Sequence, residues 1–150
     1  MVDKKNATNL TQNIRGLVQD LSEILDARMV ELRRGTPIDG VRPFDAKVFM
    51  LASRHTRSAS KIAKSLGVSK QAVQAAVQRL MAQNVVELVL VDGNKKEKIV
   101  QITEQGKKAR VVAAQLIQTL EEEMVEKIGE ERLEVLRSIL VDLNIPNVRR

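Results

Sequence analysis

The sequence predicts a mainly α-helical fold with one small β-hairpin, and three observations support this prediction. Apolar residues recur every three or four positions through most of the chain. Two runs rich in β-branched residues, 85–91 and 98–102, flank the turn sequence Asp92-Gly93-Asn94. The chain has two phenylalanines and no tyrosine or tryptophan, so its core must be built from aliphatic side chains, methionine and alanine.

The N-terminal segment is expected to form one long amphipathic helix over Thr8–Arg34. Its apolar residues recur at helical spacing, at Leu10, Ile14, Leu17, Leu21, Leu25 and Leu32. Glycines and prolines between residues 35 and 43 then break the helix. A short helix should follow over Asp45–Arg54 and bury Val48, Phe49 and Leu51.

Two further helices are separated by a glycine turn. Ser58 is the candidate N-cap of a helix that ends at about Leu66, and Gly67 can adopt the positive φ that commonly ends a helix. Ser69 is the candidate N-cap of the next helix, which should extend to about Gln83. Its buried side should hold Val73, Val77, Leu80 and Met81, opposite a solvent-facing side of Gln71, Gln74, Ala75 and Gln78.

After the hairpin, two helices are expected to complete the chain. Thr103 is the candidate N-cap of the first, whose apolar stripe is Val112, Leu116, Leu120, Met124 and Ile128. Gly129 should interrupt this helix. The last helix is predicted over Glu130–Leu143, with Pro146 preventing its extension.

The order of helix, glycine turn, helix and hairpin between Ser58 and Gly106 is that of a helix-turn-helix followed by a wing. Its commonest use is to place one helix in the DNA major groove. We therefore expect an N-terminal dimerisation helix and loop (1–44), a winged helix-turn-helix DNA-binding module (45–110) and C-terminal dimerisation helices (111–150). The apolar stripes of the terminal helices need a partner, which a second copy would provide. An intramolecular bundle is the alternative.

Positive charge is concentrated on the middle of the chain. Between Asp45 and Arg110, 13 Lys or Arg residues stand against 5 Asp or Glu, a net charge of +8. The remaining residues hold 12 basic and 14 acidic side chains, a net charge of −2. Such asymmetry is typical of a surface that binds a polyanion, and a solvated surface of mixed charge is the alternative.

The residues expected to contact DNA fall into three groups. A glutamine can form two hydrogen bonds with an adenine edge and a helix N-terminus favours anions, so the recognition-helix candidates are Ser69, Lys70, Gln71, Gln74 and Gln78. The wing candidates are Asn94, Lys95, Lys96 and Lys98. The further phosphate candidates are Arg54, Arg57, Lys61 and Lys64. Arg79 is ambiguous, because its guanidinium could bind a phosphate or pair with a carboxylate within the fold.

Several other classes of site are not indicated. The absence of cysteine excludes disulfides, thiolate metal sites and thiol redox sensing. The single histidine, His55, is expected to be an exposed loop residue and not a general base. No catalytic set or phosphate-binding glycine loop is visible, so neither an enzyme nor a bound cofactor or metal is predicted. No apolar run has membrane-spanning length, so a cytoplasmic protein without a membrane partner is expected.

With its elements in this order, the chain resembles the MarR (multiple antibiotic resistance regulator) family of winged-helix transcription regulators. IAKSLGVSKQAV at 62–73 is similar to the family's helix-turn-helix, and ITEQG at 102–106 is similar to its LTxxG motif. The resemblance implies a homodimer held by the N- and C-terminal helices and a pseudo-palindromic double-stranded DNA site. It also implies a cleft for a small organic effector that releases the repressor from DNA, with Phe44 and Phe49 as candidates for its floor or for the core.

Two departures from the family pattern matter. The family's wing usually carries an arginine near its tip, where this chain has Asn94, Lys95 and Lys96, and its recognition helix often offers an arginine where this chain has Ala75. A hydrated lysine ammonium suits phosphates better than a narrow minor groove, so the wing should grip phosphates more than it reads sequence. The alternative function therefore stays open: a winged-helix module for protein or RNA binding, or for non-specific architectural DNA binding.

Overall fold

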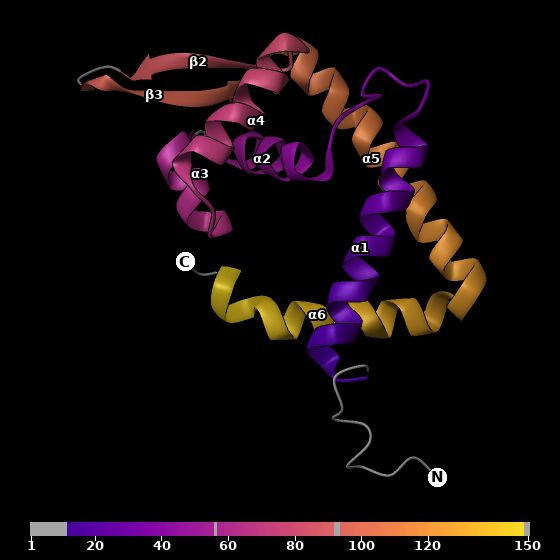
Figure 1. The fold of residues 1–150 in the computed structure, drawn as a ribbon. Coiled ribbons are helices and arrows are strands. Elements are labelled where there is room, and N and C mark those ends of the chain that lie inside the picture. The colour runs from indigo at the N-terminus through magenta and orange to yellow at the C-terminus, as the bar shows by residue number, and fades with distance from the viewer. Residues whose placement is uncertain (1–11, 56, 92–93, 149–150) are drawn as a thin grey trace.

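The structure of the protein is a computed structural model that describes residues 12–55, 57–91 and 94–148, without the side chains of residues 91, 94–96 and 145–148. Figure 1 shows a group of short helices with a hairpin on one side and long helices on the other. The elements are α1 (Ile14–Arg33), α2 (Pro43–Arg54), β1 (Arg57–Ser58), α3 (Ala59–Leu66), α4 (Lys70–Ala82), β2 (Val86–Val91), β3 (Asn94–Ile102), α5 (Glu104–Ile128) and α6 (Glu130–Val148). The predicted fold class, mainly α with a small hairpin wing, is confirmed.

The first two helices begin at residues other than those predicted. Residues 8–11 lie outside the described residues, and α1 begins at Ile14, because the Asn13 side chain accepts a hydrogen bond from the Gly16 backbone N–H at 2.8 Å and so caps the helix. Helix α2 begins at Pro43, two residues before the predicted start. Proline suits the first helical position, because its φ is fixed near the helical value and no N–H is needed there.

The end of the last helix and the extent of the sheet also differ from the prediction. The expectation that Pro146 prevents extension beyond Leu143 was wrong, because α6 continues to Val148. Pro146 lies two residues from the end, so its missing N–H affects only the last turn. Strand β3 starts at Asn94, four residues before the predicted Lys98, and the two-residue strand β1 was not predicted at all.

Three predicted caps are confirmed. The hydroxyls of Ser58, Ser69 and Thr103 accept hydrogen bonds from backbone N–H groups in the first turns of α3, α4 and α5, at 3.3, 3.1 and 3.0 Å. Gly67 ends α3 in the left-handed conformation, with φ of 66°. The helices of the helix-turn-helix therefore begin after Ser58 and Ser69, and the first of them ends at Gly67, as predicted.

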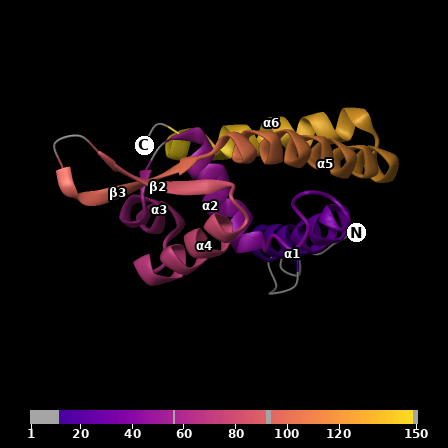
Figure 2. The ribbon, with the colours of Figure 1, turned by 90° about the horizontal axis from the view of Figure 1, so that it is seen from above.

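The three strands form one antiparallel sheet in the order β1-β3-β2. The register pairs Val86 with Ile102 and Leu90 with Lys98, so alternate residues of β2 face the helices. Val86 and Val100 on that face are buried. Beyond them the β2–β3 hairpin extends away from the helices in both views, as the predicted wing (Figures 1 and 2).

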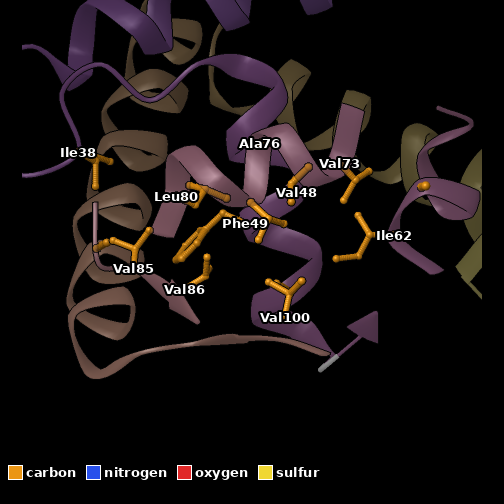
Figure 3. Close-up of a cluster of buried hydrophobic side chains, with 14 residues drawn as sticks. Ile38, Val48, Phe49, Ile62, Val73, Ala76, Leu80, Val85, Val86 and Val100 are labelled. Carbon is orange, nitrogen blue, oxygen red and sulfur yellow. The ribbon is translucent and has the colours of Figure 1, made fainter. Parts of the chain in front are cut away.

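The core lies between α2, α3, α4 and the sheet and is aliphatic, as predicted (Figure 3). Val48, Ile62 and Val73 are completely buried, and Phe49 contributes the one buried aromatic ring among the described residues. Full burial of one such side chain stabilises the fold by about 1.5–3 kcal/mol. Leu51 and Met81, predicted to be buried, are only partly buried, because they pack at the margin of this cluster.

Ion pairs connect the long helices. Arg28 of α1 donates from Nε to both carboxylate oxygens of Glu123 of α5, at 3.0 and 2.9 Å. Arg137 of α6 lies 2.8 Å from a carboxylate oxygen of Glu121. Within the described part of the chain, no helix combines the length and apolar character needed to cross a membrane.

Candidate nucleic-acid interface

Helix α4 is fixed to the core along one side. Val73, Ala76, Val77 and Leu80 are all buried, as the helical spacing of this segment requires. At the margin of this side, Arg79 donates from Nε and Nη2 to the two carboxylate oxygens of Asp45 in α2, both at 2.8 Å. The ambiguity over Arg79 is therefore resolved in favour of a carboxylate within the fold.

The Arg79–Asp45 pair fixes the position of α4 on α2. Asp45 is only 4% exposed, and its hydrogen bonds to Arg79 raise the pKa of that guanidinium. A buried carboxylate left without its partner is strongly unfavourable, so the pair resists separation. Asp45 was not singled out from the sequence, where it reads as an acidic residue in the first turn of a helix.

The opposite side of α4 is exposed, as predicted. Lys70, Gln71, Gln74 and Gln78 are exposed, and Ala75 lies beside them. At 100° per residue the three glutamines lie within about 60° of one another around the helix axis. The helix thus presents a narrow stripe of amides, referred to below as the glutamine stripe (Gln71, Gln74 and Gln78).

A groove of about 630 Å³ lies between α4, the start of α3 and the wing. It brings two of the predicted groups together, because Lys70, Gln74 and Gln78 of α4 line it with Lys98 of β3. Sequence analysis did not select the other lining side chains, among them Ser60, Leu88 and Glu97. Leu88 could have been found from the alternation along β2, which places it on the same face as Val86.

The other candidates for DNA contact whose side chains the structure describes lie outside this groove. Lys61 and Lys64 are exposed on α3, whereas Arg57 donates to the Ser65 hydroxyl at 3.1 Å. Arg54 is exposed at the end of α2 but lines a different cavity. The side chains of Asn94, Lys95 and Lys96 lie outside the described residues, so the wing-tip prediction rests on sequence. His55 is exposed next to the end of α2, as expected.

A second cavity, of about 370 Å³, lies between α1, α2 and α5. Its lining is mostly apolar and includes Phe49, while Phe44 packs against the core instead. Three cationic side chains, Arg33, Lys47 and Arg54, line it together with one acidic residue, Asp26. Arg33 is buried and donates to the Val41 carbonyl at 3.0 Å, and burial lowers the pKa of its guanidinium.

A third hollow, of about 590 Å³, lies where α1, α5 and α6 approach one another. Leu21 and Leu25 of α1 line it with Leu120, Met124, Leu133 and Leu136 of α5 and α6. Further large apolar side chains on the same three helices are exposed, at Leu17, Ile24, Ile117, Ile139, Leu140 and Leu143. Exposed apolar patches of this kind often mark interaction sites.

The helix-turn-helix, its hairpin and the long flanking helices define a winged-helix fold. Residues 48–97 match the model of the MarR family, which confirms the resemblance noted from the sequence. No curated protein matches the chain.

Solved structures share the fold along almost the whole chain. A MarR-family transcriptional regulator from Rhodococcus sp. RHA1 is 18% identical, with 93% of this chain and 97% of that one covered and a TM-score of 0.76. The repressor CouR, bound to a 23-mer DNA duplex, is 17% identical, with 91% and 96% covered and a TM-score of 0.75. Apo MarR from E. coli is 19% identical, with 87% and 96% covered and a TM-score of 0.75.

Proposed function

We propose that this protein is a sequence-specific double-stranded DNA-binding transcriptional regulator, acting as a homodimeric repressor that a small organic ligand releases. The observation that carries the proposal is the groove that gathers Lys70, Gln74, Gln78 and Lys98 on the part of the chain with a net charge of +8. An exposed helix with amides for base edges, beside lysines for phosphates, has the composition that major-groove reading requires. CouR, which shares the fold, has been solved on a DNA duplex.

The DNA contacts are assigned by position. The glutamine stripe faces base edges, and Ser69 and Lys70 meet phosphates or a base edge at the N-terminal end of α4. Lys98, with Asn94, Lys95 and Lys96, grips the backbone from the wing. Arg54, Arg57, Lys61 and Lys64 are assigned to contacts with flanking phosphates. This is a binding function without a catalytic step.

The exposed apolar side chains of the long helices support the proposed homodimer. Packing two copies through α1, α5 and α6 covers the hollow lined by Leu25, Leu133 and Leu136 and places two α4 helices on one duplex. The operator is then pseudo-palindromic. Leu25→Glu should lower the mass measured by light scattering from dimer to monomer, whereas Val68→Glu, an apolar-to-acid change in the helix-turn-helix turn, should leave the dimer intact. A wild-type monomer at micromolar concentration would refute this part of the proposal.

The effector is assigned to the cavity between α1, α2 and α5. Its apolar lining and its excess of cationic side chains suit an apolar molecule that carries an acidic group. Helix α2 both lines the cavity and holds α4 through Asp45 and Arg79, so a ligand that shifts α2 changes the position of α4. CouR, of the same fold, has also been solved with p-coumaroyl-CoA, at 18% identity and a TM-score of 0.71.

A second candidate function is favoured by the charge of the site. The wing carries lysines instead of arginines and the exposed face of α4 is largely neutral, a combination that suits non-specific phosphate binding or a protein or RNA partner. The two candidates differ in their discrimination between duplex sequences.

Selection of the purified protein against a random duplex library distinguishes these functions. The enriched duplex and a scrambled control are then titrated at two salt concentrations. We expect a two-fold symmetric motif that is bound far more tightly than the control. Salt-dependent binding without an enriched motif would replace the proposal with the architectural function. If the protein bound no duplex at all, the remaining candidate would be a module that binds protein or RNA.

A further inference from the structure

We propose that the half-site read by α4 consists of A·T base pairs at its centre, with guanine read only at the edge next to Lys70. This inference rests on the proposed function and names the class of DNA sequence that the site selects. Three observations on α4 carry it: the engagement of its one arginine, the position of its one lysine, and the composition of the exposed stripe.

Guanine is read most often by a guanidinium or ammonium group that reaches its O6 and N7 atoms. The α4 sequence contains one arginine, Arg79, and one lysine, Lys70. Arg79 uses Nε and Nη2 on Asp45, at 2.8 Å each, and lies at the margin of the helix away from the glutamine stripe. Its release would leave a carboxylate that is 4% exposed without its partner. Arg79 is therefore not available to a base.

Lys70 is the first residue of α4 and is exposed. It therefore stands at one end of the exposed face of α4, next to the Ser69 cap. A guanine contact from α4 is consequently confined to the base pair next to this end. No cationic side chain of α4 follows it along the exposed face.

The centre of the exposed face is made of amides and a methyl group. The stripe from Gln71 to Gln78 is seven residues long, which corresponds to about 10.5 Å along the helix axis. This is the length of roughly three base-pair steps of about 3.4 Å. A glutamine pairs with the N6 and N7 atoms of adenine, and the exposed methyl of Ala75 beside the stripe suits the thymine methyl group.

The test compares duplex selection by the wild type and by Gln74→Arg, with Gln105→Arg as the control. Gln105 is exposed in the first turn of α5, so the control adds the same charge away from the stripe. Gln74 is also exposed, so the variant should fold, which circular dichroism checks. We expect A·T pairs across the three central positions of the wild-type motif. We expect guanine at one of these positions for Gln74→Arg and an unchanged motif for Gln105→Arg.

Affinity measurements provide the second readout. Replacing one central A·T pair by G·C should weaken wild-type binding by roughly 5- to 150-fold, the range that corresponds to one bidentate base contact. The inference would be overturned by a wild-type motif with G·C pairs at its centre, or by a Gln74→Arg motif identical to that of the wild type. Either result would leave the proposed regulator function intact. A library without any enriched motif would overturn the proposed function and this inference with it.

Discussion

Gly106 lies where the first turn of α5 passes directly over the backbone between α4 and β2. A Cβ atom placed on Gly106 would lie 2.2 Å from the Val85 carbonyl oxygen and 3.2 Å from the Ile102 Cβ atom. The Val85 carbonyl cannot simply rotate away, because it accepts a hydrogen bond from the Thr103 N–H at 3.1 Å. The glycine of the ITEQG motif is therefore required by a close backbone approach.

Two opposing effects set the stability of Gly106→Ala. Alanine is favoured over glycine within a helix by about 1 kcal/mol. Ordinary contact begins near 3.4 Å, so the new methyl group is about 1.2 Å too close to the carbonyl oxygen. Overpacking of this kind costs about 1–3 kcal/mol, and a rigid backbone neighbour places it in the upper half of that range. The net expectation is a loss of about 1–2 kcal/mol, which lowers Tm by roughly 2–8 °C.

Thermal unfolding followed by circular dichroism at a fixed protein concentration measures this loss. The concentration is fixed because the Tm of the proposed dimer would depend on it. Gln105→Ala is the matched control, since it introduces the same residue one position earlier at an exposed site and should leave Tm nearly unchanged. A Tm for Gly106→Ala at or above the wild-type value would refute the reasoning, because helix propensity would then outweigh the close approach.

Three further predictions follow from the core, the wing and the long helices. Ile62→Ala removes a completely buried side chain and should lower the free energy of unfolding by about 2–5 kcal/mol in denaturant titrations, while Val68→Ala at an exposed position should change it little. Replacing Lys95 and Lys96 with alanine should weaken binding to many duplexes about equally and reduce the slope of log affinity against log salt by roughly one per lost phosphate contact; an unchanged slope would count against a wing that grips phosphates. Hydrogen bonds from Arg28 hold the pKa of Glu123 below its usual 4.5, so the stabilisation from this pair is complete above pH 4.5 and is lost as the pH falls through the lowered pKa. The stability of Glu123→Gln should accordingly fall less between neutral and acidic pH than that of the wild type, and parallel pH profiles would contradict this assignment.

Local signals in the sequence were sufficient to predict most of the fold. Ser58, Ser69 and Thr103 cap helices where predicted, because capping depends on one side chain and the backbone two or three residues away. The burial of Val73 and the exposure of the glutamine stripe likewise follow from helical spacing alone. The ends of the helices were less predictable. Asn13 caps α1, but Asn9, four positions earlier, is the same residue type, and the spacing of apolar residues does not distinguish the two.

Long-range contacts account for what the sequence did not reveal. Strand β1 has two residues, and only its pairing with Ile99 and Val100 of β3 makes it a strand. The partner of Arg79 is Asp45, 34 residues away, and no local pattern connects them. The cavity that includes the buried Arg33 is formed by three helices, so its charge could not be read from any one segment. Of the interface, the sequence predicted which side of α4 is exposed, but not the groove that joins it to Lys98.

The central claim is that the glutamine stripe selects particular DNA sequences while the wing grips the phosphate backbone. The most direct test is the ratio of dissociation constants for the enriched duplex and its scrambled control, measured from low to physiological salt. A specific regulator should bind the enriched duplex about 10³-fold or more tightly than the control at physiological salt, with both affinities falling as salt rises. Equal affinities throughout the salt series would contradict the claim, because the protein would then bind phosphates without reading bases.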